Sequence, residues 1–139
     1  MLKSFYHNSK TSRYLNTENT SHGQRTPKGN LGISPTNLVI TKGESTQQEM
    51  YTDTVIEVLS MQGLHSGTDP ISGDFSVAIS GYLKKDGKVI QAIRGTTLSG
   101  NFYQLLNQID LLGKELHSNT SGDFFAPLIR FGNLSVSGV

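Results

Sequence analysis

The segment His65-Ser-Gly-Thr-Asp-Pro-Ile-Ser-Gly-Asp-Phe-Ser76 joins a turn signal to the start of a strand. Proline presets φ at the second position of a turn, aspartate can accept hydrogen bonds from its own backbone, and glycine tolerates positive φ. Asp69-Pro70 followed by Ser72-Gly73 therefore predicts a tight turn. From Asp74 onward the residues alternate as they do in a strand, so this segment points to a fold built mainly of strands.

The predicted strand that follows the turn is the longest in the chain. Its apolar face consists of alternate residues, namely Phe75, Val77, Ile79, Gly81 and Leu83. Asp86-Gly87 then supplies a two-residue hairpin turn, after which the chain returns as a second strand. With that turn we expect Leu83 to lie opposite Ile90 and Gly81 opposite Ala92, so that the apolar faces of both strands coincide.

The remaining elements are shorter, except for one predicted helix. Apolar runs predict strands at 38–40 and 54–59, and a short polar helical turn is expected to begin at Ser45. The apolar residues in 101–112 recur at helical spacing and predict a helix. Asn101 or Ser99 can cap its start, and Gly113 is expected at its end. The predicted apolar stripe consists of Phe102, Leu105, Leu106, Ile109 and Leu112. Short strands are expected to close the chain. The predicted class is α+β, mostly β, with an antiparallel sheet, a long hairpin and one packed amphipathic helix.

The chain divides into two parts by composition. Residues 1–35 are polar and show little periodicity, so we expect an irregular segment that packs on the rest or leads into it. Residues 36–139 are expected to form the β-rich domain. A long irregular opening is unusual for a self-sufficient domain, so we expect a fragment of a larger protein or a shortened relative.

Composition excludes several classes of protein and of site. The formal net charge of +1 argues against a dedicated nucleic-acid binder, which usually presents a dense basic face. The absence of cysteine excludes disulfides, thiolate zinc sites and a cysteine nucleophile. No apolar run approaches a membrane span or a signal peptide, so we expect a cytoplasmic protein without a membrane or nucleic-acid partner.

The sequence gives only weak support for a catalytic site. His65, Asp69 and Asp74 could form an acid–base group, but their spacing does not enforce proximity, and aspartates often form turns for structural reasons alone. The four histidines are scattered and no HExxH motif is present. The Gly-rich stretch 95–101 lacks the lysine of a phosphate-binding loop. These motifs leave open whether the chain is an enzyme.

Several linked motifs resemble one known family. They are the run 67–76, Ala78-Ile-Ser-Gly81, the Lys-Asp-Gly-Lys hairpin, Gly95-Thr-Thr-Leu-Ser-Gly-Asn101 and Ala126-Pro-Leu-Ile-Arg-Phe-Gly-Asn-Leu-Ser-Val-Ser-Gly138. In this order they resemble the C-terminal domain of the TldD/PmbA family. The similarity covers nearly the whole chain, and several motifs in order are more specific than any one of them.

The resemblance implies a role in proteolysis. The family comprises cytosolic zinc-dependent peptidases and their partners, linked to peptide maturation and formerly described as a modulator of DNA gyrase. Catalytic members carry an HExxxH helix upstream of this domain and a metal-binding cysteine near the C-terminus; this sequence has neither. Its ending resembles the PmbA (TldE) branch, which pairs with the catalytic subunit. The resemblance implies a non-catalytic domain that contributes a subunit interface and a peptide-binding chamber, with no cofactor in this chain and zinc in the partner subunit.

The expected partners are therefore a TldD-like catalytic subunit or a second copy of the chain, together with peptide substrates. We expect no catalytic and no metal-binding residue here. The candidate contacts to peptide or to a neighbouring subunit are His65, Asp69, Gly73, Asp74 and Arg94. Three alternatives stay open: a stand-alone peptide- or protein-binding module without peptidase activity, a self-contained enzyme that uses His65, Asp69 and Asp74, and a DNA gyrase-associated regulator.

Overall fold

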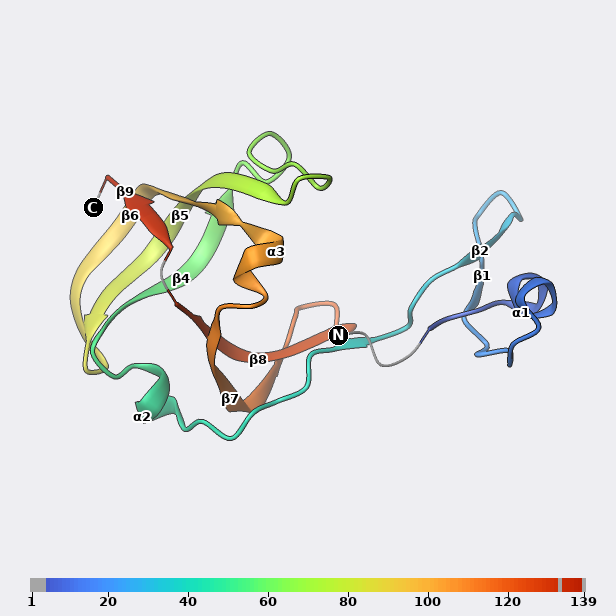
Figure 1. The fold of residues 1–139 in the computed structure, drawn as a ribbon, viewed down its shortest axis with the longest axis horizontal. Coiled ribbons are helices and arrows are strands. Elements are labelled where there is room, and N and C mark those ends of the chain that lie inside the picture. Colours follow the sequence, from blue (N-terminus) through green and yellow to red (C-terminus); the bar gives the residue numbers. More distant parts are fainter. Residues whose placement is uncertain (1–4, 133, 139) are drawn as a thin grey trace. The chain divides into compact units, whose positions relative to one another are not determined.

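Strands β5 (Asp74–Lys85) and β6 (Lys88–Asn101) form the long antiparallel hairpin that the alternation predicted (Figure 1). Strand β4 (Thr54–Gln62) pairs with β5, and β9 (Ser135–Ser137) pairs with β6, both antiparallel. The resulting four-stranded sheet has the order β4-β5-β6-β9. The predicted fold class, mostly β with an antiparallel sheet, is confirmed.

The structure is a computed structural model that describes residues 5–132 and 134–138. The chain divides into two units. The large unit comprises Thr41–His117 and Ala126–Val139, and it contains the four-stranded sheet. The small unit comprises Met1–Ile40 and Ser118–Phe125.

The register of the hairpin differs from the prediction. Asp86 and Gly87 form the turn with φ of 49° and 79°, so the tip is the two-residue turn that the sequence indicated. Beyond the tip, however, Leu83 lies opposite Gln91 and Gly81 opposite Ile93. The predicted pairs with Ile90 and Ala92 are wrong, because a β-bulge next to the turn inserts one unpaired residue into β6.

The core lies on one face of this sheet. Val77 and Ile79 of β5 are 2% and 1% exposed and pack with Leu98 of β6. Partly buried hydrophobic residues of three strands and one position just before β9 surround them: Ile56, Val58, Phe75, Leu134 and Val136. The apolar face predicted from alternation is therefore the buried face.

The predicted helix at 101–112 is wrong in length. Asn101 caps a helix as expected, accepting from the N–H groups of Tyr103 and Gln104, but α3 covers only Phe102–Leu105. The chain then forms strand β7 (Ile109–Ser118), whose neighbour in the sheet is β8 (Phe124–Phe131). Pairing with β8, the next strand along the chain, outweighs the local helical spacing. Gly113 accordingly lies inside β7 rather than at a helix end.

A short helix precedes β4, as the sequence indicated. Helix α2 covers Gln47–Met50, and its cap is Thr46 rather than the predicted Ser45. The Thr46 hydroxyl accepts from the N–H of Glu49 at 3.3 Å, and the Glu49 carboxylate accepts from the N–H of Thr46 at 2.7 Å. This reciprocal capping box satisfies two backbone donors that the first turn would otherwise leave free.

The small unit contains short elements connected by polar contacts. It has helix α1 (Ser9–Leu15), the antiparallel pair β1 (Gly23–Arg25) and β2 (Leu31–Ile33), and β3 (Leu38–Val39), which pairs in parallel with the first two residues of β8. Segment 1–35 thus contains α1, β1 and β2. Nowhere in the described part of the chain is a helix long and apolar enough to cross a bilayer.

Candidate functional site

The large unit contains an open groove of about 1280 Å³. Its lining comes from β4, the turn before β5, helix α3 and the part of β8 from Pro127 to Phe131 (Figure 1). Small-molecule pockets usually measure about 300–1000 Å³. The groove is therefore larger than a small ligand requires, and its size suits a segment of polypeptide.

The groove reaches the outer edge of the sheet. Residues 54–58 of β4 are consecutive, and all five line the groove. Side chains of a strand point alternately to its two faces, so these five residues line the groove with backbone atoms as well as side chains. Strand β4 is the last strand on this side of the four-stranded sheet among the described residues. The backbone edge of β4 is thus accessible from the groove.

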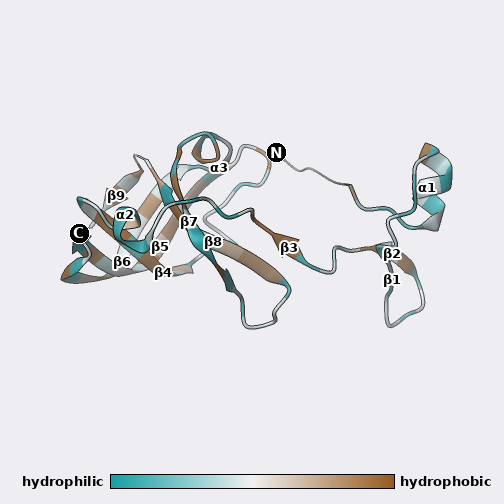
Figure 2. Cartoon of the chain, turned by 90° about the horizontal axis from the view of Figure 1, so that it is seen from below, coloured by the Kyte–Doolittle hydropathy of each residue, from teal (hydrophilic) through white to brown (hydrophobic). Residues whose placement is uncertain are grey.

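Much of the lining is apolar. Val77 and Leu98 of the core contribute to it, and so do the hydrophobic residues of β8 (Figure 2). Leu64 and Phe102 also line the groove, and they are 50% and 52% exposed. When a partner covers apolar surface that faces water, the free energy of binding becomes more favourable by about 25 cal/mol per Å² of that surface. The groove can therefore bind an apolar segment.

One end of the groove carries a closed network of Tyr51, Glu57 and Lys84. The Tyr51 hydroxyl donates to Glu57, whose Oε2 lies 2.9 Å from Lys84 Nζ, and that Nζ lies 4.1 Å from the centroid of the Tyr51 ring. Burial and the hydrogen bond to Glu57 raise the pKa of Tyr51 to about 12. Burial acts to raise the pKa of Glu57, but Tyr51 and Lys84 together outweigh it and lower that pKa. These charges are already paired.

The basic residue on the groove wall is paired as well. Arg130 Nε lies 3.1 Å from Asp110 Oδ2, and Arg130 Nη1 donates to the carbonyl of Thr52 at 2.9 Å. The guanidinium therefore connects β8 with β7 and with the loop before β4. The guanidinium stabilises the wall of the groove, and few of its N–H donors are left to bind a ligand carboxylate.

The other end of the groove is built by the turn at residues 69–74, just before β5. The Asp69 carboxylate accepts from the N–H groups of Ile71 at 2.8 Å and Ser72 at 3.4 Å, and these backbone hydrogen bonds lower its pKa. Gly73, at φ +83°, donates to the Asp69 carbonyl at 2.8 Å. Asp74 accepts from the side-chain amide of Asn101 at 2.8 Å. These hydrogen bonds hold the turn in one conformation.

The same turn is fixed to helix α3. The N–H of Phe102 donates to the carbonyl of Gly73 at 2.7 Å, and the Tyr103 hydroxyl donates to the carbonyl of Pro70 at 2.6 Å. A Cβ atom added at Gly73 would lie 2.4 Å from the Tyr103 ring, so the ring packs directly on the glycine. Only glycine satisfies both the backbone conformation and this contact.

The five predicted contact residues divide between two locations. Asp69, Gly73 and Asp74 line the groove, whereas His65 and Arg94 are exposed and do not line it. Within the described residues, His65 makes no hydrogen bond to Asp69 or Asp74. Their role as contacts to peptide or to a subunit stays a prediction.

Sequence reasoning missed the apolar lining. The helical spacing predicts that Phe102 lies on the packed face of a long helix, and no motif marks Met61, Leu64 or residues 127–131 as part of a groove. These residues come from elements far apart in the chain, so no local spacing relates them. From the sequence alone, a one-turn helix that leaves Phe102 exposed looks the same as the first turn of a longer helix.

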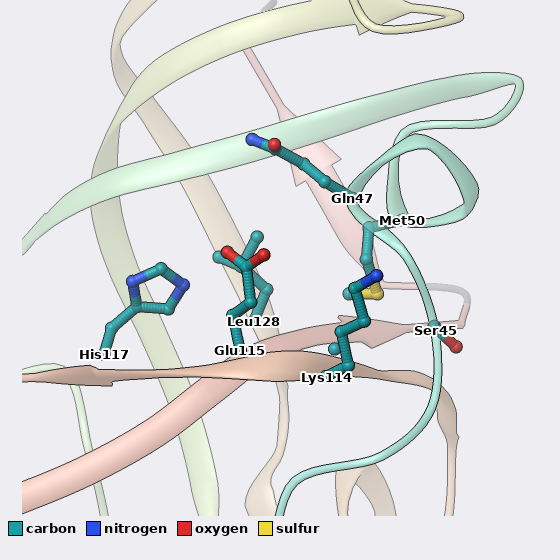
Figure 3. A pocket seen from close by; sticks show the side chains of 8 residues that line it. Ser45, Gln47, Met50, Lys114, Glu115, His117 and Leu128 are labelled. Atoms are coloured by element: carbon teal, nitrogen blue, oxygen red, sulfur yellow. The ribbon is translucent and has the colours of Figure 1, made fainter.

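A second hollow of the large unit is much smaller (Figure 3). It measures about 40 Å³ and lies between α2, β7 and β8; its lining residues are Ser45, Gln47, Met50, Gly113, Lys114, Glu115, His117 and Leu128. That volume holds only a few water molecules. The hollow is too small for a peptide or a cofactor.

The chain's donors do not fit a zinc site. A catalytic zinc needs three protein ligands, drawn from His, Cys, Asp and Glu. Across residues 5–132 and 134–138, no group of three such residues lies close enough to hold a metal ion. The sequence also contains no cysteine and no HExxxH motif. No chemical step through zinc is assigned to this chain.

Comparison with known proteins identifies the family. Residues 1–138 match the family model described as the PmbA/TldA metallopeptidase C-terminal domain. The chain belongs to this family. The resemblance noted from its motifs is thereby confirmed, and the association with metallopeptidases is a property of the family as a whole.

Known relatives are similar in sequence and in structure. A metalloprotease TldD homolog of Buchnera aphidicola is 28% identical over 84% of this chain and 24% of its own length. TldE of Thermococcus kodakarensis is 26% identical with a TM-score of 0.81, over 98% of this chain and 31% of its own. A candidate modulator of a DNA gyrase from Thermotoga maritima is 33% identical with a TM-score of 0.77, again over 98% of this chain and 31% of its own. The chain spans about a quarter to a third of these relatives.

Proposed function

We propose that this chain is a TldE-like, non-catalytic domain of a cytoplasmic zinc-dependent metallopeptidase system, and that its groove binds an extended peptide. The observation that supports this most directly is the open apolar groove that reaches the edge of β4. An added peptide strand would form main-chain hydrogen bonds with β4, and its alternate side chains would enter the groove. Main-chain bonding accepts varied sequences, as a domain that presents peptides for cleavage requires.

A matched pair of substitutions tests peptide binding. Leu64 lines the groove and Leu106 does not, yet both are 50% exposed. We expect Leu64→Asp to weaken binding of a fluorescein-labelled peptide with alternating Leu and Ser by about tenfold, because the new carboxylate would lose water on binding. Leu106→Asp should leave the dissociation constant unchanged. Equal effects of the two variants, measured by fluorescence anisotropy, would refute the groove as the site.

The catalytic role is assigned to a TldD-like partner subunit. The absence of cysteine from the sequence supports this assignment, because the family resemblance implies a metal-binding cysteine near the C-terminus of this domain in catalytic members. After incubation with zinc and desalting, the purified chain should retain well below one equivalent of metal by elemental analysis and cleave no peptide. It should co-elute with a TldD-like subunit in size-exclusion chromatography. One equivalent of retained zinc would overturn the non-catalytic role, and separate elution would overturn the partnership.

A further inference from the structure

The free edge of β4 carries backbone groups that have no partner in the described part of the chain. Strand β4 pairs with β5 on one side and is the last strand of its sheet on the other. Apart from the pairing with β5, no backbone–backbone hydrogen bond involves residues 54–62 among the described residues. A row of free N–H and C=O groups along an edge is a template for a further strand.

One contact at the hairpin tip shows which groups face this edge. The carbonyl of Asp53 accepts from the N–H of Asp86 at 2.9 Å, so this carbonyl points toward the hairpin of β5 and β6. In a planar trans peptide, a carbonyl and the N–H that follows it point in opposite directions. The N–H of Thr54 therefore points away from β5, toward the free edge.

A second contact gives the same orientation further along β4. A Cβ added at Gly81 of β5 would clash with the carbonyl oxygen of Glu57, so this carbonyl points toward β5. The N–H of Val58 therefore points to the free edge. Bonding groups alternate in direction along a strand of an antiparallel pair, so Ile56 faces the edge as well. Thr54, Ile56 and Val58 thus present their N–H and C=O groups to a partner.

This row of free groups is bounded at both ends. Asp53 has a φ of +64°, outside the range of a strand. The pairing of β4 with β5 shifts between Val58 and Ser60, which makes Leu59 the extra residue of a β-bulge. Regular pairing at the edge is therefore confined to residues 54–58.

The side chains at the free positions lie on the apolar face of the sheet. Ile56 and Val58 pack against the core cluster, and both line the groove. Val77 and Leu98 of that cluster line the groove too. A strand added at this edge would thus place the side chains opposite Ile56 and Val58 on the same apolar face.

Strand β4 also lacks the usual protection of an edge. Natural edge strands are often blocked by lysine, proline or an unpaired inward charge. Residues 54–62 contain no lysine and no proline, and their single charged residue is Glu57. Its carboxylate is already paired, 2.9 Å from Lys84 Nζ. Nothing in the sequence of β4 therefore opposes the addition of a strand.

We propose that the groove takes a five-residue peptide segment antiparallel to β4, with apolar side chains at its first, third and fifth positions. These three residues would pair with Val58, Ile56 and Thr54. The proposal rests on the function proposed above, because it names the class of peptide that the same groove takes. Every pair in this sheet is antiparallel, and antiparallel pairing is slightly more stable per residue than parallel pairing.

The pairing explains why apolar residues are needed at alternate positions. In an antiparallel pair, residues directly opposite each other share a face, and the bonded pairs exchange both of their hydrogen bonds. The peptide residues that bond to β4 are therefore the ones whose side chains enter the apolar groove. The residues between them point to the other face, and their N–H groups point away from β4.

Backbone N-methylation of a labelled peptide tests this register on the full chain. One short peptide alternates Ser and Leu and contains three Leu residues. N-methylation of the three Leu residues should weaken binding by about tenfold or more, because their N–H groups donate to β4. N-methylation of three Ser residues is the matched control and should change the dissociation constant by less than about twofold. Fluorescence anisotropy measures both.

A third peptide has the same composition with its Leu residues in one block. Adjacent residues of a strand point to opposite faces, so the block cannot place all three Leu side chains in the groove. We expect it to bind about fivefold to tenfold more weakly than the alternating peptide, because less apolar surface is covered. Equal binding of the two would show that the pattern does not matter and would overturn the proposal.

Hydrogen exchange gives a readout at single amides. In the free chain, the amides of Val55 and Glu57 face β5 and should exchange slowly, whereas those of Thr54, Ile56 and Val58 should exchange quickly. Saturation with the alternating peptide should slow exchange at the latter three by about tenfold or more. Unchanged exchange at these three amides in the saturated chain would overturn the pairing.

The outcomes separate this proposal from the one on which it rests. If both methylated peptides bind as well as the parent, pairing with β4 is wrong and binding in the groove stands. If methylation of Ser rather than Leu removes binding, the antiparallel register is wrong. If the chain sediments as a dimer that the peptide does not dissociate, a second copy occupies the edge and the proposal is wrong. If no peptide binds, both proposals are wrong.

Discussion

The large unit buries six hydrophobic side chains in the described part of the chain, whereas the small unit buries Ser12 alone. The large unit is thus held by apolar packing across the β4–β6 sheet. The small unit is held by hydrogen bonds between side chains and backbone, such as those that Asn8 Oδ1 accepts from the N–H groups of Lys10 and Thr11 in the first turn of α1. Apolar packing fixes the groove on a rigid scaffold, while polar contacts of this kind exchange readily with water.

The charges of the two units differ as well. The sequence of the small unit has five Lys or Arg residues against two Asp or Glu, and that of the large unit has seven against nine. The net charge of +1 for the whole chain conceals this difference. Each unit therefore presents a charge of its own sign to a partner.

The largest effect should come from the core of the large unit. Ile79 is 1% exposed, so Ile79→Ala should lower the free energy of unfolding by about 2–5 kcal/mol through lost burial and a new cavity. Ile71→Ala is the matched control, because Ile71 is 90% exposed and should cost close to nothing. Urea denaturation measures both. A small loss at Ile79 would show that the sheet is not the main source of stability.

The second effect separates backbone strain from a steric clash. Gly73 and Gly63 share a φ of +83°, but an added Cβ would meet the Tyr103 ring at 2.4 Å only at Gly73 and nothing within 4 Å at Gly63. Gly63→Ala should cost about 1 kcal/mol for the positive φ. Gly73→Ala should cost about 1–3 kcal/mol more, since the ring must move. Equal losses in thermal or urea unfolding would mean that the turn and α3 are not in contact.

A third, local effect should appear in the small unit. Asn8→Ala removes the acceptor for the N–H groups of Lys10 at 3.0 Å and Thr11 at 2.9 Å, which should cost about 1 kcal/mol. Hydrogen exchange should accelerate at these two amides and stay unchanged at Val77. Asn8→Ser, which keeps a capping oxygen, should behave nearly as the unmodified chain. Equal acceleration at Val77 would indicate that the two units unfold together.

The smallest effect concerns pH and the Tyr51–Glu57–Lys84 network. The pKa of Glu57 is lowered from 4.5, so its stabilising contribution is present above pH 4.5 and is lost as the pH falls through the pKa of the folded state. Glu57→Gln should lower stability at pH 7 by less than about 1 kcal/mol and reduce the additional loss on acidification. Glu44→Gln is the control. Thermal unfolding at pH 7 and pH 3 measures the difference, and identical acid dependence would contradict the pairing.

Local chemistry predicted those parts of the fold that depend on neighbouring residues. The alternation in β5 and the Asp86-Gly87 turn predict the hairpin. The turn-forming residue types predict the tight turn that contains Asp69, Gly73 and Asp74. The bulge in β6 was not predicted, because one inserted residue has no signal of its own. The length of the helix predicted at 101–112 was wrong, because Ile109 and Leu112 continue the helical stripe of the sequence and also fit strand β7, which pairs with β8. The groove lining was not predicted, since it joins β4, α3 and β8 only after folding.

The small unit is assembled from two distant pieces of chain, which has a consequence for synthesis on the ribosome. Asn37 donates to the carbonyl of Gly122, and 85 residues separate them. At about 5–20 residues per second, β3 waits roughly 4–17 s for its partner to be made. Strands β4, β5 and β6 follow one another directly, so the hairpin sheet can form during that interval. The expected order of folding thus begins in the middle of the chain, and the N-terminal piece is completed only after β8 has been made.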